Sequence, residues 1–62
     1  MLELKEIIRD TNVDDLIEKY YVEFRKGTMI INRKILVDDF IRLRENIRKR
    51  MTINNIIVDA DR

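Results

Sequence analysis

The clearest pattern in the chain is an apolar seam in its second half, where hydrophobic side chains recur at helical spacing. The seam consists of Leu36, Phe40, Leu43, Ile47 and Met51. A parallel row, Val37 and Ile41, widens the hydrophobic face to the width typical of a helix that packs on a core. Charged side chains occupy most of the other side. The spacing predicts a helix over residues 33–51.

A similar seam precedes the single glycine of the chain, Gly27. Its members are Val13, Leu16, Ile17, Tyr20, Tyr21 and Phe24. Asn12 is a suitable N-cap, and a glycine directly after basic residues is typical of a helix end. These signals predict a helix over residues 13–26. The run Tyr20–Phe24 also has high β-propensity, so a strand there is the alternative.

Shorter apolar groups flank the two predicted helices. A short N-terminal helix is indicated by Leu4, Ile7 and Ile8. Ile53 and the run 56–58 are too apolar for a free tail, so they indicate a short strand or an extended, packed segment. Residues 28–35 could likewise supply a strand ahead of the long helix.

Together these elements predict an all-α fold in a single small helical domain, residues 1–62. Its centre is an antiparallel helical hairpin, to which a short N-terminal helix and an extended apolar C-terminal segment are added. The predicted core faces across the hairpin and consists of Leu16, Tyr20, Phe24, Leu36, Phe40, Leu43 and Ile47.

A chain of 62 residues can bury little apolar surface, and domains of this size usually need disulfides, a metal or a partner. The chain contains neither Cys nor His, which excludes disulfides and an ordinary zinc site. We therefore expect a homo-oligomer.

No stretch approaches the roughly 20 apolar residues of a membrane span. Charges also interrupt the N-terminal residues where a signal peptide would be apolar. The sequence thus predicts a cytoplasmic protein without membrane contact.

The inventory of side chains argues against catalysis. Without His or Cys, the chain lacks the usual acid–base group at neutral pH and the thiol nucleophile. One glycine cannot form a phosphate-binding loop. The adjacent acids Asp14–Asp15 and Asp38–Asp39 diverge on a helix and do not form a carboxylate pair. We expect a protein that is not an enzyme and that holds no cofactor or metal.

Charge is distributed unevenly along the chain. Residues 1–24 carry seven acids against three bases, whereas residues 25–51 carry nine bases against three acids. Two helices of opposite charge could complement each other, or the basic half could face nucleic acid or an acidic partner. The candidate nucleic-acid-binding residues all belong to the long predicted helix: Arg42, Arg44, Arg48, Lys49 and Arg50. Acids interrupt that helix, so we treat a DNA- or RNA-binding regulator as the alternative function.

Several short runs resemble a known family. They are Asp15–Tyr21, Ile31–Arg33, Asp39–Asn46, Lys49–Arg50 and Ile56–Ile57. With the two helices placed as above, these runs are similar to the Sda family, small helical-hairpin checkpoint proteins that inhibit the histidine kinase starting sporulation in bacilli. The similarity covers roughly residues 13–58, and the first twelve residues have no counterpart. Arg44 stands where the family has an apolar residue.

The resemblance implies a regulatory, kinase-inhibiting protein that binds the dimerisation helices of a sensor histidine kinase. By position, Phe40 and Ile41 match an aromatic–Ile pair of the family, and Ile31 matches the apolar residue before Asn-Arg. The residues themselves add Met29 and Ile30, because the apolar run 29–31 lies where a loop would be polar. A structural, self-associating helical bundle is the third hypothesis.

Overall fold

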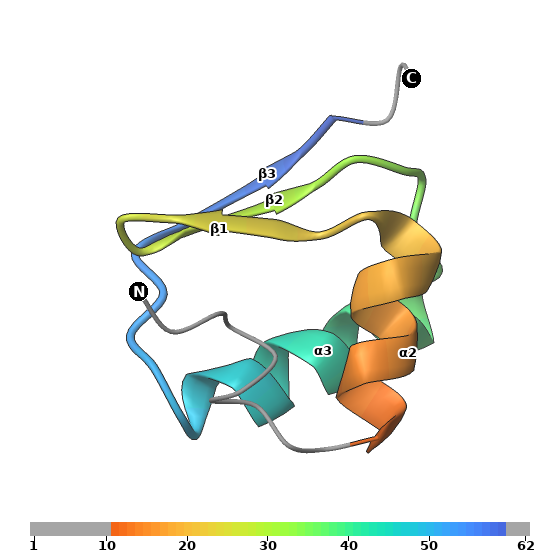
Figure 1. Cartoon of the computed structure of the whole chain (residues 1–62), viewed down its shortest axis with the longest axis horizontal. Helices are drawn as coiled ribbons and strands as arrows, with labels where there is room; N and C mark the ends of the chain where they lie inside the picture. The colour runs from red at the N-terminus through yellow and green to blue at the C-terminus, as the bar shows by residue number, and fades with distance from the viewer. Residues whose placement is uncertain (1–10, 60–62) are drawn as a thin grey trace.

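The computed structural model describes residues 11–59. They form two helices and three strands, in the order α2 Thr11–Tyr20, β1 Glu23–Arg25, β2 Thr28–Ile31, α3 Val37–Arg48 and β3 Asn55–Val58. The strands make one mixed sheet in the order β1-β2-β3, in which β2 pairs antiparallel with β1 and parallel with β3. Parallel strands need a long crossover connection, and here helix α3 lies in the connection between β2 and β3. Both helices lie on the same side of the sheet (Figure 1).

The core lies between the helices and the sheet. Its buried side chains are Val13, Leu16, Ile17, Tyr20, Val22, Met29, Ile31, Leu43 and Ile47. In β2 the residues alternate, so that Met29 and Ile31 point to the helices while Ile30 points to the opposite face. The register places Phe24 and Ile56 beside Met29, which continues the buried row across all three strands.

The predicted all-α helical hairpin is wrong. The helix predicted over residues 13–26 ends at Tyr20, because Tyr21 takes a left-handed conformation with φ +51°. The amide of Val22 donates to the carbonyl of Ile17 at 2.9 Å, and that of Tyr21 to Glu18 at 3.4 Å. This pair of bonds is the Schellman arrangement that closes helix ends, here without the usual glycine.

The glycine serves a different turn. Lys26 and Gly27, with φ +46° and +79°, form the two-residue connection between the paired residues Arg25 and Thr28. Positive φ at both central positions defines a type I′ turn, whose twist suits a β-hairpin. Two alternatives from the sequence are therefore closer to the structure. The strand suggested at Tyr20–Phe24 corresponds in part to β1, and the strand suggested within residues 28–35 corresponds to β2.

The long seam does form a helix, α3, but the helix is shorter than the predicted range 33–51. Leu36 is its N-cap and is 64% exposed, so the prediction that Leu36 is a core residue is wrong. Phe24 and Phe40 are partly buried, and the other four predicted core residues are buried. Of the two alternatives for the apolar C-terminal segment, the structure has the short strand, β3, which includes residues 56–58 but not Ile53. The predicted N-terminal helix lies outside the described residues.

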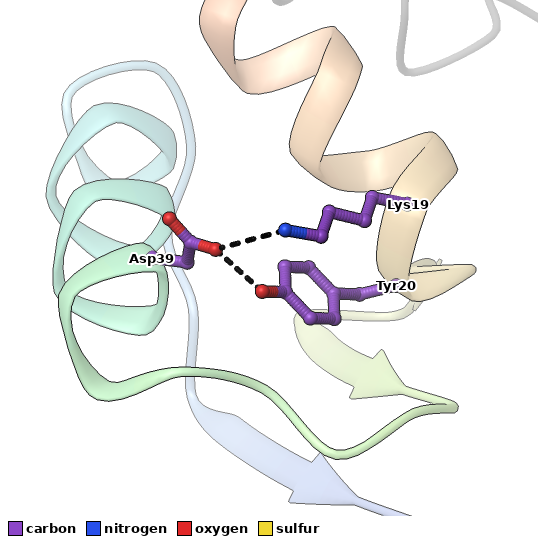
Figure 2. A network of polar contacts seen from close by, with 3 residues as sticks. All are labelled: Lys19, Tyr20 and Asp39. Atoms are coloured by element: carbon purple, nitrogen blue, oxygen red, sulfur yellow. Dashed lines mark hydrogen bonds and ion pairs between the residues drawn. The ribbon is translucent and has the colours of Figure 1, made fainter.

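A polar contact joins the two helices where the last turn of α2 meets the first turn of α3. The hydroxyl of the buried Tyr20 donates a hydrogen bond to Asp39 Oδ2, and Lys19 Nζ lies 3.7 Å from the same oxygen (Figure 2). Lys19 also lies over the Tyr20 ring, 5.2 Å from its centroid. This contact fixes α2 against α3, so that α3 is held in place beneath the sheet.

Candidate functional site

The tip of the β1–β2 hairpin is fastened to the segment that follows α3. The carbonyl of Gly27 accepts hydrogen bonds from the amides of Asn54, at 2.8 Å, and Asn55, at 3.3 Å. At the start of this segment, directly after α3, the amide of Met51 donates to the carbonyl of Ile47 at 3.0 Å, which adds one more helical hydrogen bond to the end of α3. The hairpin tip, the C-terminal end of α3 and the start of β3 therefore lie at one end of the molecule (Figure 1).

A shallow pocket of about 280 Å³ opens at this end. It is lined by Arg44, Arg48, Ile53, Asn54 and Ile56. Arg44 and Arg48 are four residues apart on α3, so both side chains project from the same flank of the helix. The carboxamide of Asn54 adds a neutral donor and acceptor beside the two guanidinium groups.

Six cationic residues belong to the elements that meet at this end, and two of them, Arg44 and Arg48, line the pocket. We define the basic end by Arg25, Lys26, Arg44, Arg48, Lys49 and Arg50, all of them exposed. No acidic residue occurs between Asn46 and Val58. Arg25 forms an ion pair with Glu23 at 3.5 Å, and both partners are exposed, so water screens this pair strongly. The basic end thus carries a concentrated positive charge.

The structure brings together most of the predicted nucleic-acid-binding residues. Arg44, Arg48, Lys49 and Arg50 belong to the basic end. Arg42 does not, because it lies in the middle of α3, almost two turns before the C-cap Lys49 and about 200° around the helix from Arg44. Sequence reasoning missed Arg25, Lys26 and Asn54, which join the site only through the hairpin. A weaker signal was present, since a short segment containing glycine between two strand-forming runs is also a hairpin pattern.

The residues predicted to bind a protein partner are dispersed. Met29 and Ile31 are fully buried in the core, so their side chains cannot contact another molecule. Phe40 packs against the core from α3. Ile30 is half-buried on the opposite face of the sheet, and Ile41 is exposed on α3. These five residues do not form one surface.

The chemistry of the basic end is that of anion binding. Guanidinium groups offer paired N–H donors that match the oxygens of a phosphate or carboxylate. Within residues 11–59, no three Asp, Glu, His or Cys side chains gather as metal ligands. Neither described helix is long and apolar enough to cross a membrane.

Comparison of the chain with models of known protein families, with curated proteins and with solved structures finds no match. The resemblance to the Sda family therefore stays a prediction, although the helical hairpin that it implies is not the fold of this chain.

Proposed function

We propose that this protein is a non-enzymatic nucleic-acid-binding module, whose basic end contacts the phosphate backbone. The observation that supports the proposal best is the meeting of cations from three segments: the hairpin tip, the C-terminal half of α3 and the loop that follows it. The hydrogen bonds from Asn54 and Asn55 to the Gly27 carbonyl join the hairpin tip to the segment that follows α3, and the amide of Met51 ties the start of that segment to Ile47. Neutralising phosphates supplies most of the affinity of sequence-independent binding.

The shape of the basic end also suits a polyanion. A protruding hairpin and a helix end give cations at different heights, which can follow a phosphate backbone at several successive positions. The pocket between α3 and the segment that leads into β3 offers Arg44, Arg48 and Asn54 to a single phosphate group. Side-chain amides and guanidinium groups are common donors to backbone phosphates.

A helical protein partner has weaker support. That expectation rested on the hairpin fold, which the structure contradicts, and on an apolar tip formed by residues 29–31. Two of those three side chains are in the core, and the loop at the hairpin tip is Lys26–Gly27 instead.

The test is fluorescence anisotropy with a labelled mixed-sequence DNA duplex and, separately, a single-stranded RNA, at several salt concentrations. The logarithm of the association constant should fall linearly with the logarithm of the salt concentration. Lys26→Asn and Arg48→Gln should each weaken binding on every sequence and reduce the slope by about one.

Arg42→Gln is the matched control, because it removes the same charge from the opposite flank of α3. It should leave the slope unchanged. The proposal is overturned if neither nucleic acid binds at low salt, or if all three variants weaken binding equally. In the latter case net charge alone, and no defined site, would account for the binding.

A further inference from the structure

The two edges of the sheet differ in how well they are protected against pairing. The β1 edge is three residues long and carries the charged residues Glu23 and Arg25 at its ends. Short strands and charges are what natural sheets use to prevent edge-to-edge association. Strand β3, Asn55-Ile56-Ile57-Val58, forms the other edge and carries no charge, proline or glycine. No strand within residues 11–59 pairs with its outer side.

Exposed apolar side chains concentrate beside this unprotected edge. Among the described residues, six large hydrophobic side chains are highly exposed, and five of them lie on β3 or on α3 and its cap: Leu36 64%, Val37 72%, Ile41 47%, Ile57 50% and Val58 46%. The sixth, Tyr21, lies near the β1 edge, where the guanidinium of Arg33 is stacked 4.3 Å from its ring centroid. Within residues 11–59, most of the exposed large hydrophobic side chains therefore belong to β3 and α3.

Helix α3 places some of these side chains beneath the edge. Val37, Ile41, Arg44 and Arg48 are separated by four, three and four residues, so they form a single stripe along one flank of the helix. The stripe faces the β3 edge, because Arg44 and Arg48 line a pocket with Ile53 and Ile56. Its N-terminal half is apolar and its C-terminal half is basic.

The helical layer also stops short of the edge. Val58 pairs with the fully buried Ile31, so the register directs both side chains to the face that the helices cover. Val58 is nevertheless half exposed, whereas Ile31 is completely covered. The sheet thus ends before its apolar side chains are enclosed, and one further strand on β3 would cover them.

We propose that a second copy of this chain supplies that strand, with β3 of each copy pairing antiparallel about a twofold axis near Ile57. Two three-stranded sheets would then join into one continuous sheet. An interface of this kind uses the same surface on both subunits, so it must be complementary to itself.

The sequence of β3 meets this requirement. With Ile57 on the axis, Ile57 faces its own copy and Ile56 faces Val58, so that the contacts at the centre are all apolar. Antiparallel pairing also sends the two basic ends in opposite directions, whereas parallel pairing would bring the cations together. Along the α3 stripes, the arginines of one copy would lie beside Val37 and Ile41 of the other, which their aliphatic stems can cover.

Dimerisation of this type has a consequence beyond stability. It would place the two basic ends at opposite ends of the paired β3 strands, and a nucleic acid spanning both would be bound with avidity. The proposal does not depend on the nucleic-acid interface, because pairing of the β3 edge is measured on the protein alone.

The absence of cysteine makes a direct test simple, since a single introduced thiol can react only with its copy. Residues that face each other across an antiparallel pair are close enough for a disulfide. Ile57→Cys under mild oxidation should therefore form a covalent dimer rapidly. Glu23→Cys is the matched control, because Glu23 lies in the same cross-strand row as Ile57, at the opposite edge. It should remain largely monomeric in the same time.

Light scattering of the unmodified chain over about a hundredfold range of concentration supplies the second measurement. The expected mass is that of a dimer, and Ile57→Lys should shift it to a monomer while Glu23→Lys should not. A monomer mass for the unmodified chain at every concentration would overturn the proposal. Equal rates of disulfide formation by the two cysteine variants would overturn it as well.

Discussion

A Cβ atom at Gly27 would lie 2.9 Å from the side-chain amide nitrogen of Asn54. The backbone reason for glycine is stronger than this contact, because Gly27 has φ +79° and the Asn54 side chain is exposed and able to move. Gly27 thus combines two roles: it closes the hairpin and presents its carbonyl to the amides that begin β3. One residue therefore couples the local turn to the pairing of strands that are distant in sequence.

Gly27→Ala should destabilise the protein by about 1–2 kcal/mol, the cost of a left-handed conformation for a residue with a Cβ atom. Gly27→Asn should lose less, because Asn tolerates this region better. Chemical denaturation of the three proteins measures the differences. Equal stability of the Ala and Asn variants would indicate that contact with Asn54, and not the backbone conformation, determines the cost.

Lys26→Asn separates stability from binding. Asn-Gly is the preferred pair for a type I′ turn, so this substitution should stabilise the hairpin by about 0.5 kcal/mol or more. The same change removes one cation from the basic end. A variant that melts at a higher temperature yet binds nucleic acid more weakly cannot owe its weaker binding to unfolding. A lower melting temperature would show that the Lys26 side chain makes a contact that the turn depends on.

The long helix and half of the core could be predicted from the sequence because they depend on local periodicity. Leu43 and Ile47 recur at helical spacing and are buried, as predicted. Leu36 continues the same spacing but falls at the helix N-cap, beyond the sheet that covers the other two. Periodicity identifies the side of a helix that faces the core, whereas the extent of the covering layer decides which turns are buried.

The sheet could not be predicted in the same way, because its signals are shared with helices. Residues 13–24 have helical spacing throughout, yet the chain leaves the helix at Tyr21 without the glycine or asparagine that usually marks this conformation. A glycine after two basic residues fits both a helix end and a hairpin turn.

The basic end was partly identified, since its α3 residues are close together in the sequence. The contribution of the hairpin required knowledge of the pairing between β2 and β3.

Two leucines that the same pattern assigned to the core should differ in their effect on stability. Leu43→Ala should cost about 2–5 kcal/mol, because the side chain is fully buried and its removal leaves a cavity. Leu36→Ala should cost less than about 0.5 kcal/mol, as is usual for exposed positions. Thermal and chemical denaturation of both variants test this contrast. A large loss at Leu36 that depends on protein concentration would indicate that association buries this side chain.

The contact between Tyr20 and Asp39 should stabilise the packing of α2 against α3. In Tyr20→Phe, the carboxylate keeps Lys19 but loses a hydrogen bond from a buried hydroxyl, so the variant should be less stable by about 1–3 kcal/mol. Asp39→Asn changes the partner instead, and the double variant completes a thermodynamic cycle that isolates the pairwise energy. A coupling energy near zero would mean that the two side chains contribute independently to the stability of the protein.

The control is Tyr21→Phe, which removes the hydroxyl of an exposed neighbouring tyrosine. That hydroxyl accepts a 3.3 Å hydrogen bond from Arg33. Its effect should be small, because water can replace that bond at the surface, and a loss equal to that of Tyr20→Phe would show that burial of the hydroxyl is not the cause.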